Sequence, residues 1–225
     1  MADILSNLDW SILTGVLLSI IPALLCITIH ELAHGYTAYR LGDNTAKDMG
    51  RLTLNPIKHI DIFGLLMMLV FRFGWAKPVP VNMHNFKRPR TGMAVTAVAG
   101  PLSNVVLATI VFFVYGLIFT LLGGFDSQGL KGLALEMIHR TAYLSIALAI
   151  FNLAPIPPLD GSKVLFSFLS DEAYYKLMRY ERFGMILLIV FLSTPLFANT
   201  IGRLTTTVYG FMIEKIAQTA FNLVN

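Results

Sequence analysis

The sequence contains little charge and almost no cysteine. Only 13% of its 225 residues are Asp, Glu, Lys or Arg, whereas soluble domains average about 25%. Cys26 is the single cysteine, which excludes an intrachain disulfide. No basic stripe with interleaved aromatic residues is present, so we expect no nucleic-acid partner. Hydrophobic residues make up 56% of the chain, a composition typical of an integral membrane protein.

Four charge-free segments are long enough to cross a bilayer, which takes about 18 or more apolar residues. They cover residues 11–29, 93–124, 141–159 and 183–202. Residues 62–71 are too short to span unaided and are expected to be interfacial, re-entrant or buried. Glu214 and Lys215 interrupt residues 204–224, which therefore stay ambiguous between a span and an interfacial helix. The expected fold is an all-α polytopic helix bundle of about four to six transmembrane segments, in one domain over residues 1–225.

The basic residues predict how the chain is oriented. Nine of the 17 Lys and Arg residues lie in residues 40–92 and four lie in residues 163–182. Positive loops stay cytoplasmic, so these segments are expected inside, with the amino terminus and residues 123–132 outside. Asp3 and Asp9 precede the first apolar run and no Lys or Arg does, which favours a retained span over a cleaved signal peptide. We expect a multi-pass protein of the cell membrane whose net charge of +4 reflects topology and contact with anionic lipid.

Residues 42–92 form the one soluble-looking stretch. The alternation in "RLTLN" (51–55) and the alternating Pro and Val of "KPVPVN" (77–82) favour short strands. Pro78 and Pro80 would confine the second strand to a sheet edge. We therefore expect a small β-like region on the cytoplasmic side, to which an extended substrate could add as a further strand.

The stretch "HELAH" places His30, Glu31 and His34 at the end of the first apolar run. Residues four apart share one face of a helix, so both imidazoles can reach one tetrahedral zinc ion. Glu31 can then reach a metal-bound water as general base. The alternative is a helix end whose polar residues face headgroup water. Ionisable groups inside a span cost about 2.5–3.5 kcal/mol each, and a metal would account for all three.

A catalytic zinc usually has three protein ligands, and the sequence offers two serious candidates for the third. Cys26 lies on the same face as the two histidines, but the three would extend over about 12 Å of helix, so we interpret it as a packing residue. Asp160 follows three prolines that break the preceding helix beside an expected cavity. Taken alone, Asp160 is better interpreted as the N-cap of the next helix, a role that can coexist with metal binding. The other histidines, in loops or near helix ends, are His59, His84 and His139.

The chain resembles the site-2 protease family of intramembrane zinc metalloproteases. The resemblance rests on "HELAH", on "AGPLSN" (99–104) and on "NLAPIPPLDG" (152–161), and the loop segments are similar to those of minimal bacterial and archaeal members. It implies that His30, His34 and Asp160 bind one zinc ion and that Glu31 activates the water. We expect a minimal core with no PDZ-like insertion and no carboxy-terminal regulatory domain.

The resemblance also implies roles for three small or amide residues. Asn152 is expected to contact substrate or to steady the oxyanion, with a buried amide at the helix break as an equal alternative. Gly100 and Asn104 match a motif thought to pack the helices closely, as small residues do at helix crossings.

The function implied is hydrolysis of peptide bonds within or near transmembrane segments of membrane-protein substrates, in regulated intramembrane proteolysis. The oligomeric state is left open. Two alternatives are a membrane metal transporter and a non-catalytic module that binds transmembrane segments. Manganese or iron could also occupy a site made of two histidines and a carboxylate.

Overall fold

The computed structural model describes residues 10–71, 74–121 and 129–224, and most of them are helical. The three longest helices are α2 (Trp10–Arg40), α5 (Pro89–Leu121) and α6 (Gly129–Asn152). Each is long and apolar enough to cross a membrane, over Leu18–Arg40, Pro89–Thr120 and Gly132–Asn152. The prediction of an all-α polytopic membrane protein is therefore confirmed.

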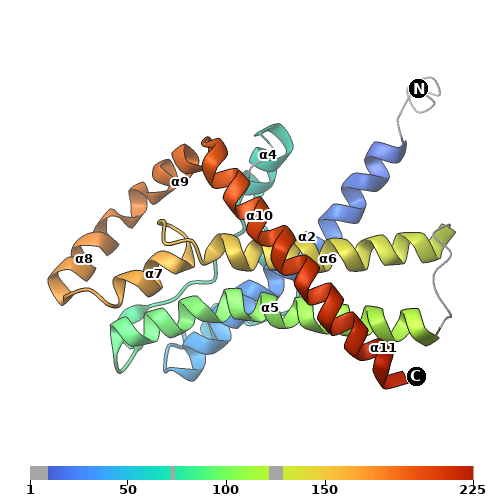
Figure 1. Cartoon of the computed structure of the whole chain (residues 1–225). Coiled ribbons are helices and arrows are strands. Elements are labelled where there is room, and N and C mark those ends of the chain that lie inside the picture. The colour runs from blue at the N-terminus through green and yellow to red at the C-terminus, as the bar shows by residue number, and fades with distance from the viewer. Residues whose placement is uncertain (1–9, 72–73, 122–128, 225) are drawn as a thin grey trace.

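The helices α2 and α6 both pack against α5 in the centre of the molecule (Figure 1). Ala108 on α5 and Ala142 on α6 are fully buried, so the two backbones approach closely. Phe112, Ile146 and Met212 complete this core. The helix α2, which carries the "HELAH" stretch, contacts both α5 and α6 beside this core.

The third span lies earlier in the chain than the predicted residues 141–159. It ends at Asn152 because the proline-containing segment that follows cannot continue a helix. It begins earlier because Glu136 and Arg140, four residues apart, form an ion pair with 2.5 Å between Oε1 and Nη2. Two charges that neutralise each other cost less inside a span than either charge alone.

Residues 183–202 do not form one straight span. The helices α9 (Gly184–Leu192) and α10 (Pro195–Met212) meet at an angle of 81°, so the described chain has three spans, or four if this bent pair counts as one. Pro195 lacks a backbone N–H, and it holds Thr194 in an extended conformation at φ −90° and ψ 127°. The break therefore follows from one proline inside an otherwise charge-free run.

The ambiguous tail packs along α5. The helix α10 continues through a π-helical turn, η4 (Ile213–Ala217), into α11 (Gln218–Val224). A Cβ atom added at Gly116 on α5 would lie 2.5 Å from the carbonyl oxygen of Ala217, so the two backbones are in direct contact. The tail is thus part of the bundle.

The short elements lie in the loops and beyond α6. They are α3 (Thr45–Asp48), η1 (Pro56–His59), α4 (Ile62–Phe71), η2 (Met83–Asn85), α7 (Asp160–Phe166), α8 (Asp171–Tyr180) and η3 (Glu181–Phe183). The helix α4 is too short to span, as predicted for residues 62–71, and a Cβ at Gly64 would lie 2.0 Å from the carbonyl oxygen of Trp75.

The predicted short strands are wrong for the residues that the structure describes, where no strand occurs. Residues 77–82 instead form an irregular segment whose position is fixed by side chains. Arg51 donates to the carbonyl oxygen of Lys77 over 2.8 Å, and Asp43 accepts from the backbone N–H of Asn82 over 2.7 Å. Pro78 and Pro80 have no N–H with which to extend a ladder.

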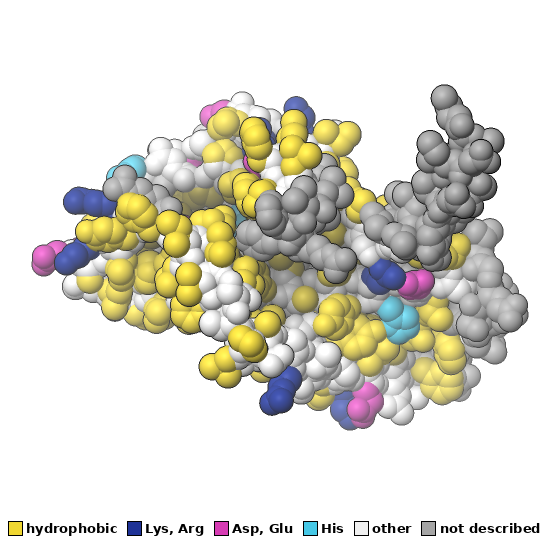
Figure 2. Space-filling view, turned by 90° about the horizontal axis from the view of Figure 1, so that it is seen from above, with side chains coloured by type: hydrophobic (Ala, Val, Ile, Leu, Met, Phe, Trp, Pro, Cys, Tyr) yellow, Lys and Arg dark blue, Asp and Glu magenta, His cyan; other side chains and the backbone are white. Residues whose placement is uncertain are grey.

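The surface matches a membrane protein. Hydrophobic side chains cover most of the described face in Figure 2, and the charged groups gather in a few places. Large apolar side chains on α5 and α9 are exposed, among them Leu102 (56%), Ile110 (55%) and Ile186 (65%). Soluble monomers rarely expose apolar patches of this extent, whereas a lipid-facing surface requires them.

Candidate metal centre

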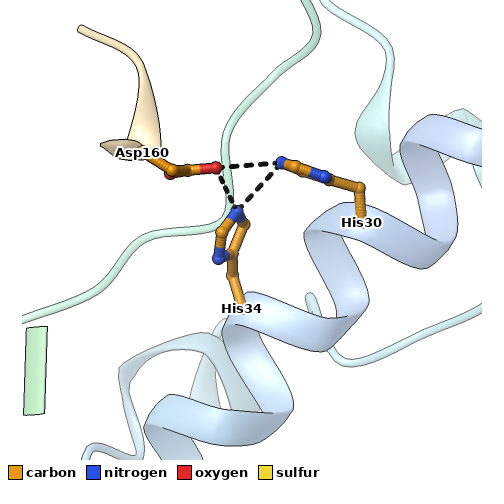
Figure 3. A group of neighbouring side chains, drawn as sticks. All are labelled: His30, His34 and Asp160. Atoms are coloured by element: carbon orange, nitrogen blue, oxygen red, sulfur yellow. Dashed lines mark hydrogen bonds and ion pairs between the residues drawn. The ribbon is translucent and has the colours of Figure 1, made fainter. Parts of the chain in front are cut away.

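Three side chains converge between α2 and α7. His30 and His34 lie on successive turns of α2, and Asp160 begins α7 on the opposite side (Figure 3). Asp160 Oδ2 lies 3.2 Å from His30 Nε2 and 3.1 Å from His34 Nε2, and the two Nε2 atoms are 3.0 Å apart. The first span and the chain after the third span thus meet at one point.

The donor atoms fit a divalent metal. Ligands about 2.0–2.1 Å from a tetrahedral ion lie about 3.3 Å from one another, close to the spacing of these three atoms. His34 Nδ1 lies 2.7 Å from the carbonyl oxygen of Thr96 and must donate to it, which leaves a lone pair on Nε2 of the neutral ring. That lone pair faces Asp160 Oδ2, a buried oxygen that accepts no hydrogen bond. Facing lone pairs in a buried site repel each other, and a cation between them would turn that repulsion into attraction. Within the described ranges, no other three potential ligands lie so close together.

The position of Asp160 depends on the non-helical segment between α6 and α7 and on the glycine that follows it. It is the first residue of α7, whose N-cap is Leu159, and no side chain caps that helix. The N-cap interpretation is therefore wrong, since the carboxylate faces the imidazoles. Gly161 is required because a Cβ there would lie 2.2 Å from the carbonyl oxygen of Leu153.

The charge of Asp160 is supported by its neighbours. Burial by itself would raise the pKa of this carboxyl, but the adjacent imidazoles of His30 and His34 and the positive charge of Lys163 hold it well below its usual range. Lys163 Nζ lies 3.9 Å from Oδ1 and 3.6 Å from Glu181 Oε1. The site therefore contains an ionised carboxylate ready to bind a cation.

One face of α5 forms the wall behind the two imidazoles. Thr96, Gly100 and Asn104 lie four residues apart on it and so share one face. A Cβ at Gly100 would lie 2.3 Å from His34 Nε2 and 2.7 Å from His30 Cε1. The expectation that Gly100 allows close packing is thus met in a specific way, because the glycine makes room for the rings themselves.

Glu31 lines a cavity of about 190 Å³ beside the three donors, together with Asn152. Its Oε2 atom accepts a hydrogen bond from the backbone N–H of Val79 over 2.7 Å, so the irregular segment 77–82 fixes the position of the carboxylate. Pro78 and Val81 line the same cavity. Glu31 lies beside the group of three side chains that could bind the metal and is not part of that group; its role as general base stays a prediction.

The other candidate residues have structural partners. Asn152 Nδ2 donates to the carbonyl oxygen of Leu148 over 2.9 Å, which is the helix-end role foreseen as one alternative; a substrate role for its amide stays a prediction. Cys26 is buried with Sγ 3.5 Å from the Thr141 carbonyl oxygen, which confirms packing between α2 and α6.

Three other histidines lie outside the metal site. His59 contacts the Thr53 carbonyl oxygen, His139 contacts the Tyr209 hydroxyl, and His84 is exposed. Sequence reasoning missed the Thr96 carbonyl and the Val79 N–H, because a backbone group leaves no mark on residue type.

Comparison with known proteins agrees with this geometry. The family model described as Peptidase family M50 matches residues 18–195. A Bacillus subtilis (strain 168) protein named "Putative zinc metalloprotease YwhC" is 43% identical over 183 residues, which cover 79% of this chain and 80% of that protein. A Mycolicibacterium smegmatis protein named "Putative zinc metalloprotease Rip2" is 28% identical over 186 residues, which cover 80% of this chain and 69% of that protein. No solved structure matches.

Proposed function

The chain belongs to peptidase family M50, and from this membership we propose that it cleaves peptide bonds within or near transmembrane segments of membrane-protein substrates. Membership and the names of the relatives make it a membrane metalloprotease. One observation carries the finer proposal: His30 and His34, which face Asp160, lie inside the candidate span Leu18–Arg40. A hydrolytic site built into a span is suited to substrates that also lie in the bilayer.

The residues take distinct roles in the proposed reaction. His30, His34 and Asp160 would hold a single divalent ion, and zinc is the ion that the relatives' names give. When bound, such an ion polarises a carbonyl and lowers the pKa of a coordinated water to about 7. Glu31 removes the proton of the attacking water and passes it to the leaving amine. The bond from Val79 to Oε2 fixes the orientation of the Glu31 carboxylate for this step.

The segment 77–82 supports a specific way of holding substrate. Lys77 donates its N–H to the carbonyl oxygen of His59 over 3.0 Å and Val79 donates to Glu31, while Pro78 and Pro80 have no N–H. The segment therefore offers acceptors and few donors. We expect an extended substrate to donate its own N–H groups to the Pro78 and Pro80 carbonyls, in the manner of an added strand.

That substrate geometry has a chemical test. Replacing one substrate amide by an ester removes a single N–H donor and leaves the side chains unchanged. Esters scanned through the residues beside the cleavage site should slow cleavage at alternate positions, because only alternate N–H groups point to the same edge. Uniform rates at all positions would refute the proposed pairing.

The proposed setting is the cell membrane, with the site reached from the cytoplasm. In Figure 1 the carboxyl end of α2, the start of α5 and helices α7 and α8 lie at the same end of the molecule. Residues 40–92 and 163–182 hold 13 of the 17 basic residues, and basic loops stay cytoplasmic. A hydrolytic site within the membrane that is reached from the cytoplasm suits regulated intramembrane proteolysis.

Glu31→Gln tests the proposed reaction. The variant should keep its bound metal and lose cleavage of a transmembrane peptide in proteoliposomes, because the amide removes the base and leaves the ligands in place. Glu172→Gln, which changes an exposed acid on α8, is the matched control and should cleave like wild type. Wild-type cleavage by Glu31→Gln would remove Glu31 from its role.

The transporter alternative is less well supported. An ion path needs successive polar sites across the membrane, and the described helices bring together one group of possible ligands. Metal flux through proteoliposomes without peptide cleavage would favour transport instead.

A further inference from the structure

The two imidazoles of the candidate metal centre are not held in the same way. Both rings in Figure 3 direct Nε2 toward Asp160, so Nδ1 of each ring faces α5. His34 Nδ1 meets the carbonyl oxygen of Thr96, an obligate acceptor, at 2.7 Å. His30 Nδ1 meets the side-chain amide of Asn104 at 3.2 Å, and the nearer atom of that amide is Nδ2. His34 is thus provided with an acceptor, whereas His30 faces a group that offers either a donor or an acceptor.

Metal binding makes a clear demand on that amide. A neutral imidazole that binds a metal through Nε2 carries its proton on Nδ1, and this N–H needs an acceptor. Asn104 Oδ1 is buried and accepts no hydrogen bond, while Nδ2 lies against the ring. A half-turn of the amide exchanges the two atoms in almost the same space. It places the unsatisfied oxygen on His30 Nδ1 and gives His30 the partner that His34 already has.

Asn104 is well placed to impose this arrangement. Its side chain is fully buried, so it faces His30 without competition from bulk water. Ser145 on α6 donates to its backbone carbonyl over 2.8 Å, and this bond ties α5 to α6 behind the metal centre. Gly100, one turn away, leaves the space in which the His30 ring lies against α5. The ring position is therefore set by α5, and Asn104 is the polar side chain on that face that contacts it.

We propose that Asn104 is a positioning residue, whose Oδ1 accepts the Nδ1–H of His30 and so selects the ring tautomer that presents a lone pair to the metal. The inference deepens the proposed function, because it rests on His30 being a ligand. It assigns Asn104 more than a packing role. The acceptor on the side chain, and not its volume, is what the metal centre uses.

Two substitutions with the same number and branching of side-chain heavy atoms separate these roles. Asn104→Asp keeps an acceptor for His30 Nδ1–H, whereas Asn104→Leu removes it. Zn²⁺ affinity of the purified full chain in detergent, measured by competition with a chromophoric chelator, should fall about 10- to 100-fold in Asn104→Leu, as for other lost partners of ligating histidines. Asn104→Asp should stay near wild type. If Asn104→Leu does not fold, Asn104→Ala, which fits the same space, replaces it.

A second measurement reports the tautomer without relying on activity. In ¹⁵N-histidine-labelled protein, the ring-nitrogen shifts of His30 should show Nδ1 protonated in the wild type and in Asn104→Asp. The tautomers should become mixed in Asn104→Leu. A purely structural role for Asn104 would change the unfolding temperature and leave these shifts unchanged.

The outcomes separate this inference from the proposed function. Loss of affinity in Asn104→Leu with retention in Asn104→Asp supports the inference. Wild-type affinity in Asn104→Leu, or equal losses in both variants, overturns it even while Asp160→Asn abolishes binding and the metal site stands. Wild-type protein that binds no Zn²⁺ would instead overturn the proposed function, and this inference with it.

Discussion

Gly100→Ala is the substitution for which the structure makes the most specific forecast. The added Cβ would lie 2.3 Å from His34 Nε2, 2.5 Å from His34 Cε1 and 2.7 Å from His30 Cε1, whereas ordinary contacts begin near 3.4 Å. To restore such contacts, His34 Nε2 must retreat by about 1.1 Å and His30 Cε1 by about 0.7 Å. Metal sites tolerate departures of only about 0.2 Å in ligand distance. One methyl group therefore displaces both imidazoles from the metal position.

The expected magnitudes differ between folding and function. Overpacking a buried site costs about 1–3 kcal/mol, offset in part by the higher helix propensity of alanine, about 0.5–1 kcal/mol. The fold should survive this change. Misplacement of catalytic groups by about 1 Å costs about 10²-fold in rate, so metal binding and cleavage should fall much further than stability.

The assay compares Gly100→Ala with Gly210→Ala, a helical glycine whose added Cβ would meet nothing within 4 Å. Metal content, cleavage of a transmembrane peptide and unfolding temperature in detergent should all stay near wild type for Gly210→Ala. Gly100→Ala should lose most of its metal and nearly all cleavage. Wild-type metal content and cleavage in Gly100→Ala would refute the packing of the rings against α5.

Three further predictions follow from other parts of the molecule. Removing the metal with a chelator should stop cleavage and lower the unfolding temperature, since a ligand that binds the folded state stabilises it; Asp160→Asn should abolish the chelator's effect on unfolding. Burial by itself would raise the pKa of Asp43, but hydrogen bonds from Thr45, Asn82 and Asn85 lower it. The ionised Asp43 carboxylate therefore stabilises the fold fully above the unfolded-state pKa of about 3.9. This stabilisation is lost as the pH falls through the lower pKa of the folded state. Asp43→Asn should remove that part of the acid dependence in unfolding curves between about pH 5 and pH 2, and an unchanged curve would count against it. Gly161→Ala should reduce metal content, because the added Cβ would lie 2.2 Å from the Leu153 carbonyl oxygen and must displace Asp160.

Much of the candidate site could be predicted from sequence because its elements are local. His30 and His34 are four residues apart, and helical geometry alone places them on one face. Asp160 was harder, because its approach to α2 depends on how the chain turns after α6. The residues alone favoured a cap, and the resemblance supplied the ligand role. The Thr96 carbonyl and the Val79 N–H were invisible, since every residue type carries these groups.

The errors in the fold have identifiable physical causes. Counting charge-free residues merged α9 and α10, although Pro195 was visible as a helix break. The same rule misplaced the third span, because Glu136 and Arg140 neutralise each other within the helix. The strand expected at residues 77–82 relied on alternation alone, and the prolines that create this alternation also remove the donors that a ladder needs.

The central claim is that α2 and the start of α7 bind one metal ion between them. Its most direct test is metal content per chain, measured by elemental analysis on purified wild type and on Asp160→Asn, with Asp171→Asn as an exposed control on α8. The account predicts about one zinc per chain in wild type and control, as for a single three-ligand catalytic site, and almost none in Asp160→Asn. A full complement of metal in Asp160→Asn would contradict it.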